Sequence, residues 1–312
     1  MAGLDKALYN FIRRRQIPGL ATGAVYADSQ GILSAFDVGK TYFVAGNYGL
    51  DTNDGSSWQK AFKTLAAAIS ANNTNIAAGS HGWAARNKIY ISGDTFAEDL
   101  VAFPNKCDVI GVGSYDANDQ PGISGHHAPV NTGNYGTRFF NVHFKAKAVA
   151  SAVVTLVNSS SGIQFIGCTG DATLGTVTSF VLATASPFLK VIGCDFRGGF
   201  ATSYISCGAG EAGGARIIGN DMTGSLGKGV VLASDTTTSW PAVMRENFVQ
   251  SAGQWVDDDA DLLYIVGNDG ITAIDCATYT AGFDANLLRM ARNTQTGSNA
   301  GDHDSVPHML FA

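Results

Sequence analysis

The chain has few charged residues, and those it has do not form a basic surface pattern. Of its 312 residues, 15% are Asp, Glu, Lys or Arg, against about 25% in ordinary globular proteins. This scarcity excludes a long charged helix or coiled coil, and the 45% hydrophobic content excludes a disordered chain. The net charge is −6, and the basic cluster is confined to residues 13–15. Nucleic acid is therefore not an expected partner.

The sequence also lacks segments for export or membrane insertion and lacks common metal-binding spacings. No apolar run reaches the ~20 residues of a membrane helix, and the first residues do not have the order of a secretory signal. The five cysteines are odd in number and contain no C-x-x-C, so neither a disulfide framework nor a zinc site is expected. We expect a protein that folds in a cytoplasm and has no membrane partner.

Glycine, by contrast, is abundant, with 38 residues, and it recurs within a repeated phrase. The phrase has two β-type apolar residues, a Gly or small polar residue, then Cys or Asn, then a polar residue. Its copies are 109–113, 139–143, 165–169, 191–195, 217–221, 244–248, 265–269 and 290–294. The gaps between their third residues are 30, 26, 26, 26, 27, 21 and 25. A period in the twenties with short β runs indicates a solenoid.

The repeat predicts an all-β parallel β-helix of about eight coils, stacked about 4.8 Å apart. A leucine-rich repeat has a similar period, but its fixed Leu pattern is missing here. Equivalent residues of successive coils then lie above one another. We expect Ile, Val and Phe to fill the interior, and Cys168 and Cys194 to share a column as buried thiols. The same argument predicts a ladder of turn asparagines: Asn220, Asn247, Asn268 and Asn293.

The segment before the repeats has the pattern of an end cap. Residues 42–44 are predicted as a strand and 49–55 as a turn-rich loop. A capping-box pattern from Ser56 to Gln59 predicts a helix over 60–71. Such a helix would cover the open end of the β-helix, where core residues and strand edges are otherwise exposed.

These residues resemble the pectate-lyase-like right-handed parallel β-helix superfamily. The telling stretches are YFVAGNYGLDTNDGSSWQKAFKTLAAAIS, KIYISGDTFAEDLVAF and CDVIGVGS, and the repeat phrase extends the resemblance to about residue 294. The resemblance implies the fold and leaves the function open, because the superfamily includes polysaccharide lyases, glycoside hydrolases, phage tailspikes and non-enzymatic virion proteins. We expect three parts: an arm over 1–40, the β-helix domain over 41–294 and a tail over 295–312.

The arm and the tail carry apolar residues that need a place to pack. A short amphipathic helix is predicted near the start of the arm, with the docking residues Leu4, Leu8, Phe11, Ile12, Arg13, Arg14 and Arg15. This helix either packs on its own β-helix or docks on a partner or on sister chains. Docking is favoured because the capping helix that follows it already covers this end of the β-helix. The polar tail ends in apolar residues over 306–311, which clip onto a neighbour or cover the last coil.

Candidate chemistry is sparse. Asp195 and Asp221 occupy one repeat position on adjacent coils, so their carboxyls should lie about 5 Å apart, near the spacing of a retaining glycosidase; a solvated carboxylate column is the simpler interpretation. The catalytic sets that the resemblance implies for polygalacturonases and pectate lyases are incomplete. His126 and His127 are expected in a surface loop.

A second acidic run offers oxygen ligands of the kind calcium prefers. Its residues are Asp257, Asp258, Asp259 and Asp261. They lack the EF-hand spacing, and a solvated loop is the simpler interpretation, so no cofactor is expected.

The leading functional expectation is a non-enzymatic structural protein of a tailed-phage virion. The resemblance and the predicted arm favour capsid decoration, cement or a short spike, assembled in the host cytoplasm as a homotrimer and attached to other virion proteins. One alternative is a tailspike-type polysaccharide depolymerase, a lyase or glycoside hydrolase, with Asp195 and Asp221 as its carboxylates. Another is a non-catalytic glycan-binding module whose stacking surfaces come from Trp58, Trp83, Trp240 and Trp255.

Overall fold

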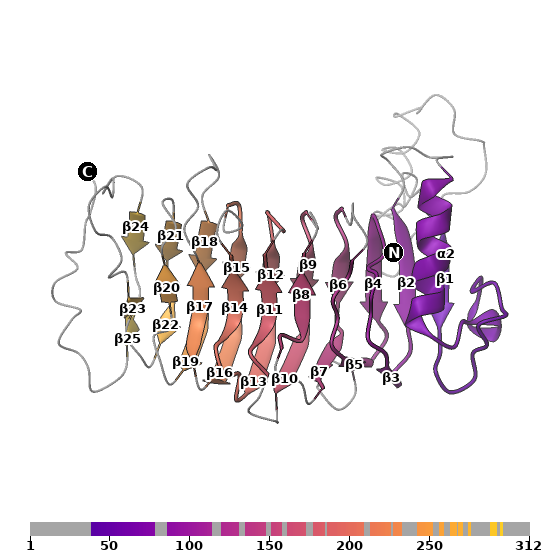
Figure 1. Ribbon diagram of the computed structural model, residues 1–312, viewed down its shortest axis with the longest axis horizontal. Coiled ribbons are helices and arrows are strands. Elements are labelled where there is room, and N and C mark those ends of the chain that lie inside the picture. The colour runs from indigo at the N-terminus through magenta and orange to yellow at the C-terminus, as the bar shows by residue number, and fades with distance from the viewer. Residues whose placement is uncertain are drawn as a thin grey trace, which may run out of the picture. The chain divides into compact units, whose positions relative to one another are not determined.

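Short parallel strands stack coil upon coil in the computed structural model of the chain (Figure 1). The structure describes residues 39–78, 86–113, 120–130, 135–147, 151–157, 161–172, 177–184, 186–208, 213–225, 227–232, 242–251, 256–258, 263–266, 268–270, 274–275, 288–291 and 294–295. The chain divides into two units, Met1–Val38 and Gly39–Ala312, and the second is described below. Most of the predicted arm and tail lies outside the described residues.

Three parallel sheets run along the stack. The first is ten-stranded, in the order β1 (Thr41–Val44), β2 (Asn87–Ile91), β4 (Cys107–Gly111), β6 (Arg138–Phe140), β9 (Gln164–Ile166), β12 (Lys190–Ile192), β15 (Arg216–Ile218), β18 (Ala242–Arg245), β21 (Leu263–Val266) and β24 (Leu288–Ala291). The second is nine-stranded, with β3 (Thr95–Ala97), β5 (Gly122–Gly125), β7 (His143–Ala146), β10 (Thr169–Ala172), β13 (Asp195–Gly198), β16 (Asp221–Ser225), β19 (Phe248–Ser251), β22 (Asp269–Gly270) and β25 (Thr294–Gln295). The third is six-stranded, with β8 (Val154–Leu156), β11 (Ser179–Ala183), β14 (Ser203–Cys207), β17 (Lys228–Leu232), β20 (Val256–Asp258) and β23 (Ile274–Asp275).

The repeat phrase marks the end of one strand in each coil. All eight copies begin within strands of the ten-stranded sheet, from β4 to β24. The sheet has two further strands, β1 and β2, which precede the first copy. The predicted all-β parallel β-helix is therefore confirmed, and the 26-residue gaps correspond to in-register pairing of β9 with β12 and of β12 with β15.

Columns of stacked side chains fill the interior. Phe139 and Phe165 stack with ring centroids 5.5 Å apart and planes 9° apart, and Val191 and Ile217 continue their column by register. Phe144 meets Phe165 edge to face. Burial of aromatic and branched side chains at matching positions removes large apolar areas from water and fixes the register of each coil.

The third residue of the phrase adopts a left-handed backbone conformation. Gly167, Gly193 and Gly219 have φ of 56°, 60° and 64°. Asn141 and Glu246 occupy the same place in their coils, with φ of 53° and 57°. Glycine adopts this conformation without strain, which accounts for its recurrence at this turn.

Glu246 is therefore a site where glycine should stabilise the protein. We expect Glu246→Gly to raise the free energy of unfolding by about 1 kcal/mol, because a residue with a Cβ is strained at positive φ. Gly219→Ala is the matched opposite: an added Cβ at Gly219 would meet nothing within 4 Å, so its loss of about 1 kcal/mol reports conformation alone. Urea unfolding of both variants checks the pair, and equal signs of the two changes would contradict this account.

The predicted asparagine ladder is present in the described coils. Asn220, Asn247 and Asn268 are buried, and each side chain bonds the next coil: Asn220 Nδ2 donates to Asn247 Oδ1 at 2.8 Å, and Asn247 Nδ2 donates to Asn268 Oδ1 at 2.7 Å. Cys194, in the same column, donates its backbone N–H to Asn220 Oδ1 at 2.9 Å. Cys168 and Cys194 are buried free thiols, as expected, while Asn293 lies outside the described residues.

The capping helix is present, but its predicted bounds are wrong. A 3-10 turn, η1 (Trp58–Lys60), replaces the expected start, and the helix α2 runs over Leu65–Ala77 instead of 60–71. Ser57 makes no side-chain cap; Thr64 caps the helix instead, accepting from Ala67 N. Glu98 also accepts from the first two backbone N–H groups of α2, at 2.8 and 2.9 Å. This carboxylate comes from a distant segment, so the local capping-box pattern could not locate the helix start.

Figure 1 shows α2 lying along β1 and β2, where it covers the first coil. No described helix is long and apolar enough to span a membrane.

Candidate functional site

The outer face of the nine-stranded sheet gathers ionisable side chains from consecutive coils. Because alternate residues point to opposite faces of a strand and Phe144, Phe196 and Met222 are buried, their neighbours point outward. We call this set the polar track; it consists of His143, Thr169, Asp171, Asp195, Arg197 and Asp221.

Asp195 and Asp221 lie side by side in the track. They are register partners on β13 and β16, as the repeat spacing predicted, and neighbouring strands lie about 4.8 Å apart. Partial burial and the adjacent charge of Asp195 raise the pKa of Asp221 above its usual value, while the charge of Arg197 opposes them. Asp221 is thus the carboxyl of the pair that holds its proton more tightly than an ordinary aspartate.

Arg197 covers the carboxylate of Asp195. Its Nε donates to Oδ1 at 3.1 Å and its Nη2 donates to Oδ2 at 2.5 Å. The Arg197 side chain is 71% exposed, whereas that of Asp195 is 16% exposed. The forked contact holds both carboxylate oxygens of Asp195 in place.

A second carboxylate arrangement lies one coil earlier. His143 Nε2 is 3.6 Å from Asp171 Oδ2, and His143 Nδ1 is 2.7 Å from Thr169 Oγ1. Thr169 donates its hydroxyl proton to Gln120, so this hydroxyl links His143 to Gln120. The hydrogen bond from His143 lowers the pKa of Asp171, which keeps this carboxyl ionised.

An aromatic ring borders the acidic pair on its other side. Phe248 on β19 is the register partner of Asp221 and is half-buried. Thr223 and Gln250, two residues further along these strands, are paired in the same way. The track and the ring of Phe248 beside it therefore place carboxylates, a guanidinium and an aromatic side chain on neighbouring coils.

The other candidate residues from the sequence are not brought into this site. Leu4, Leu8, Phe11, Ile12, Arg13, Arg14 and Arg15 lie outside the described residues, as do Asp259 and Asp261. Asp257 and Asp258 belong to β20 of the six-stranded sheet. These two residues therefore lie in a strand and not in the loop that the sequence suggested. Within the described part of the chain, no cluster of three or more His, Cys, Asp or Glu could hold a metal ion.

The expectation that His126 and His127 share a surface loop is wrong for His127. Its side chain is buried and its Nδ1 accepts from Leu100 N at 3.2 Å. Its ring packs edge to face on Phe144 at 5.8 Å. Burial lowers its pKa to about 4. His126 is half-buried, with Nδ1 2.6 Å from Ala152 O.

The buried His127 makes stability depend on pH. The folded protein keeps this ring neutral down to about pH 4, whereas the unfolded chain takes up a proton below about pH 6.5. The free energy of unfolding should therefore fall by about 2 kcal/mol on acidification from pH 7 to pH 5. Urea unfolding at both pH values should show this loss in the wild type and in the control His126→Gln, and much less of it in His127→Gln. An unchanged loss in His127→Gln would contradict the assignment.

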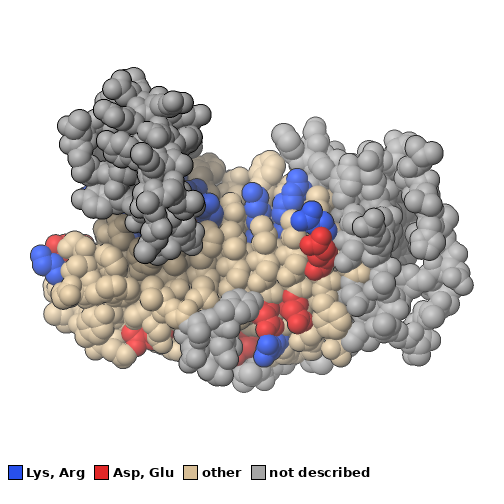
Figure 2. Space-filling model, turned by 180° about the vertical axis from the view of Figure 1, so that it is seen from behind, with Lys and Arg blue, Asp and Glu red and all other residues tan. Residues whose placement is uncertain are grey.

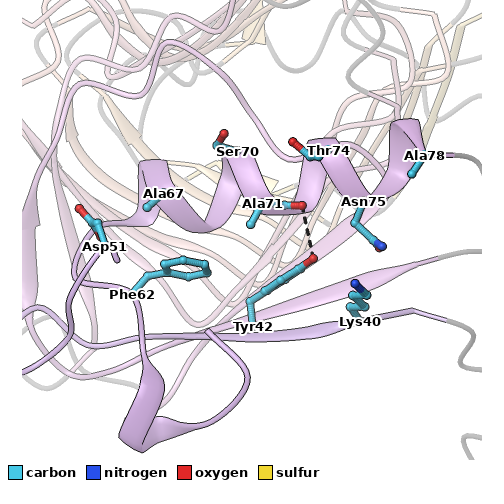
Figure 3. A pocket seen from close by; sticks show the side chains of 10 residues that line it. All are labelled: Lys40, Tyr42, Asp51, Phe62, Ala67, Ser70, Ala71, Thr74, Asn75 and Ala78. Carbon is cyan, nitrogen blue, oxygen red and sulfur yellow. Dashed lines mark hydrogen bonds between the residues drawn. The ribbon is translucent and has the colours of Figure 1, made fainter. Parts of the chain in front are cut away.

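A hollow of ≈ 590 Å³ lies beside the capping helix, between α2 and β1 (Figure 3). Lys40, Tyr42, Asp51 and Phe62 line one side, and residues of α2 line the other. The hydroxyl of Tyr42 donates to Ala71 O at 3.3 Å across its floor. The hollow contains no paired carboxylates, so the polar track is the stronger candidate for chemistry.

Sequence reasoning missed Asp171 and His143 in the track, and Phe248 beside it. Asp171, His143 and Phe248 are three different residue types. None of them has an acidic residue of its own kind at the equivalent position of the next coil, so the repeat pattern does not single them out. The signal that locates them is register: each occupies the column of Asp195 and Asp221 or the column two residues later. The inward–outward alternation of a strand relates these two columns.

Comparisons with known proteins agree with this architecture. No protein-family model and no curated protein matches the chain. Among solved structures, the crystal structure of the pectin methylesterase from Aspergillus niger in deglycosylated form is similar, at 14% identity and a TM-score of 0.51. The similarity covers 84% of this chain and 87% of that one. At this identity the likeness concerns the fold alone. The chain has a parallel β-helix fold.

Proposed function

We propose that the chain cleaves a polysaccharide by glycoside hydrolysis at the polar track. The observation that carries the proposal is the in-register pair of Asp195 and Asp221, in which one carboxylate is held by a guanidinium and the other has a raised pKa. Pairs of carboxyls whose environments separate their proton affinities are the usual acid and base of glycoside hydrolysis. This is the depolymerase alternative from the sequence, and the register pairing of Asp195 with Asp221 supports it.

The geometry assigns a role to each carboxyl. Protonated Asp221 gives its proton to the glycosidic oxygen as the bond from that oxygen to the anomeric carbon breaks, and the carboxylate of Asp195 forms a bond to this carbon. Ionised Asp221 then takes a proton from water, whose oxygen attacks the same carbon and releases Asp195. One water is consumed, and a close pair of carboxyls predicts retention of the anomeric configuration.

Arg197 has to release one oxygen of Asp195 before this carboxylate attacks. Its side chain is mostly exposed, so it can turn toward solvent or toward a substrate oxygen without unpacking the core. While in contact, it fixes the orientation of the Asp195 carboxylate.

The surroundings of the pair suit a sugar polymer. Phe248 offers an apolar ring face beside Asp221, and sugar rings commonly stack their C–H faces on aromatic rings. Asp171, Thr223 and Gln250 supply hydrogen-bonding groups on the same face. Because the coils are about 4.8 Å apart, the track extends along the stack as an extended chain of sugars would.

The test is an assay of the full chain against a panel of neutral and acidic polysaccharides. We expect new reducing ends, and nuclear magnetic resonance of the first product should show a retained anomeric configuration. Unsaturated products would indicate a lyase and contradict hydrolysis. Binding without any cleavage would also overturn the proposal, in favour of a non-catalytic glycan-binding module.

A structural role in a tailed-phage virion is the second candidate. It is favoured by the continuous ladder of buried amides and stacked rings, which stiffens the coil stack. In this case the predicted arm over 1–40 would attach the rod to capsid or tail proteins, and the chain would form homotrimers. Mass determination of the intact chain in solution tests the trimer, and a monomer would contradict it.

A further inference from the structure

The charges on the outer face of the nine-stranded sheet balance one another when Asp221 is protonated. Arg197 holds the carboxylate of Asp195, with Nη2 2.5 Å from Oδ2. Asp171 lies between Lys145 and Arg197 in register, and the nearby charge of Lys145 acts on this carboxyl. The carboxylates of Asp171 and Asp195 are therefore matched by one ammonium and one guanidinium.

The neighbouring ionisable side chains add no excess of positive charge to this face. Within the strands that the structure describes for this sheet, the lysine and arginine residues are Lys145 and Arg197. Lys147, just after β7, forms an ion pair with Asp99 at 2.6 Å. His143 is buried, and its Nε2 lies 3.6 Å from Asp171 Oδ2, so the same carboxylate opposes any proton on this ring.

The balance is kept through the first chemical step of the proposed hydrolysis. Asp221 becomes a carboxylate when it gives its proton to the glycosidic oxygen, and Asp195 loses its charge when it bonds to the anomeric carbon. One negative charge appears as another is removed, so Lys145 and Arg197 still face two units of negative charge. A carboxylate on the sugar would find no surplus cation on this face at either stage.

Uncharged side chains border the acidic pair on its other side. Phe248 is the register partner of Asp221, and Thr223 is paired with Gln250. Phe248 and Thr223 are half-buried, while Gln250 is exposed. An aromatic ring, a hydroxyl and an amide suit a sugar unit that carries hydroxyl groups, because an amide and a hydroxyl both donate and accept hydrogen bonds.

Basic residues elsewhere on this side of the molecule do not extend to the polar track. Figure 2 shows acidic and basic side chains together in a lower group, which uncharged surface separates from mostly basic side chains above. Arg138 and Lys190 belong to the ten-stranded sheet, and Arg138 pairs with Asp108 at 2.6 Å. Ile192 follows Lys190 on β12 before the turn that leads to the track.

We propose that the polysaccharide cleaved at the polar track is a neutral one, whose sugar units carry hydroxyl groups and neither carboxylate nor sulfate. This inference rests on the proposed hydrolysis and names its substrate class. A surface that binds a polyanion carries an excess of basic side chains, and the described residues of this face provide none. Each carboxylate of an acidic polymer would lie near Asp171, Asp195 or Asp221 and be repelled.

Matched pairs of polymers test the substrate class. Both members of a pair have the same linkage, and the primary hydroxyl is intact in the neutral member and oxidised to a carboxylate in the acidic member. Across several glucans and galactans, we expect the full chain to cleave neutral members with a kcat/KM about 10-fold higher at low salt. High salt should narrow the difference, since it screens exposed charges. Equal or faster cleavage of the acidic members would overturn the inference.

Binding to Asp221→Asn separates failure of this inference from failure of the proposed hydrolysis. Asn is uncharged like the protonated acid, so the charge balance is kept while cleavage is removed. Affinity electrophoresis in gels that contain each polymer then measures binding alone. Retardation by the neutral members only supports the inference even where the wild type cleaves nothing, which would refute hydrolysis. Retardation by the acidic members overturns the inference, and retardation by no polymer overturns both.

Two variants of opposite sign test the charge balance itself. Lys145→Gln makes this face more negative and should lower the ratio of acidic to neutral binding several-fold, whereas Asp171→Asn makes it more positive and should raise that ratio. Lys145 is exposed and Asp171 is half-buried, and circular dichroism establishes that both variants retain the fold. The same ratio in the wild type and in both variants would mean that charge does not select the polymer, and the inference would be wrong.

Discussion

Replacing Asp221 by Asn should lower the rate of polysaccharide cleavage by about 10²–10⁴-fold, the usual contribution of a general acid. Asn has nearly the same shape but carries no proton that can be transferred to the leaving oxygen. Binding of the polysaccharide should change little, because Asn keeps a hydrogen-bonding group at this place. Reducing-end kinetics, together with binding measured by isothermal titration calorimetry, separates the two effects.

Two further variants decide whether the effect belongs to the pair. Asp195→Asn should also abolish cleavage, whereas Asp171→Asn should retain most of it, because His143 and not the glycosidic bond is the partner of Asp171. The substitution is the same, Asp to Asn, in each variant, but Asp171 lies one coil before Asp195. Equal losses in all three variants would indicate that general surface charge, and not the acidic pair, supports cleavage.

The pH dependence follows from the same assignment. The acid must be protonated, and burial together with the charge of Asp195 raises the pKa of Asp221. Cleavage should therefore persist above the pH at which an ordinary aspartate loses its proton, and then decline as Asp221 ionises. Arg197→Gln should move this decline to higher pH, because Arg197 opposes the raised pKa of Asp221.

The fold was predictable because the repeat carries two physical constraints at once. The apolar pair in each copy must face the core, and the following residue must adopt a left-handed turn, which favours glycine. Copies that keep both, such as those at Gly193 and Gly219, align without ambiguity. The copy at Glu246 keeps only the conformation and is hard to recognise from composition alone.

The candidate site was only partly predictable, since its members depend on contacts between coils. Asp195 and Asp221 share a repeat position, so the period placed them side by side. Asp171 belongs to a neighbouring column, and His143 was visible only as the last residue of the copy at 139–143. The burial of His127 was missed for a similar reason: nothing next to it in sequence indicates that Phe144 and Leu100 enclose it.

Replacing Asn247 by Leu should destabilise the protein by roughly 3–5 kcal/mol, since it leaves buried polar groups without partners. Asn247 Oδ1 accepts from the backbone N–H of Asn220 at 3.0 Å and from its Nδ2 at 2.8 Å. Asn247 Nδ2 donates to Ile217 O at 2.9 Å and to Asn268 Oδ1 at 2.7 Å. Leu has a similar volume but can neither accept nor donate. Urea unfolding measures the loss, and hydrogen exchange should show earlier opening at the amide of Asn220.

Cys194→Ala is the matched control in the same column. It removes a buried side chain, but the backbone N–H of Cys194 keeps its bond to Asn220 Oδ1. Only a small volume and a weak thiol donor are lost, so the expected cost is about 1 kcal/mol. If the two substitutions were equally destabilising, packing alone would hold the column together. A several-fold larger effect at Asn247 would mean that the amide ladder fixes the register of the coils, and with it the placement of Asp195 beside Asp221.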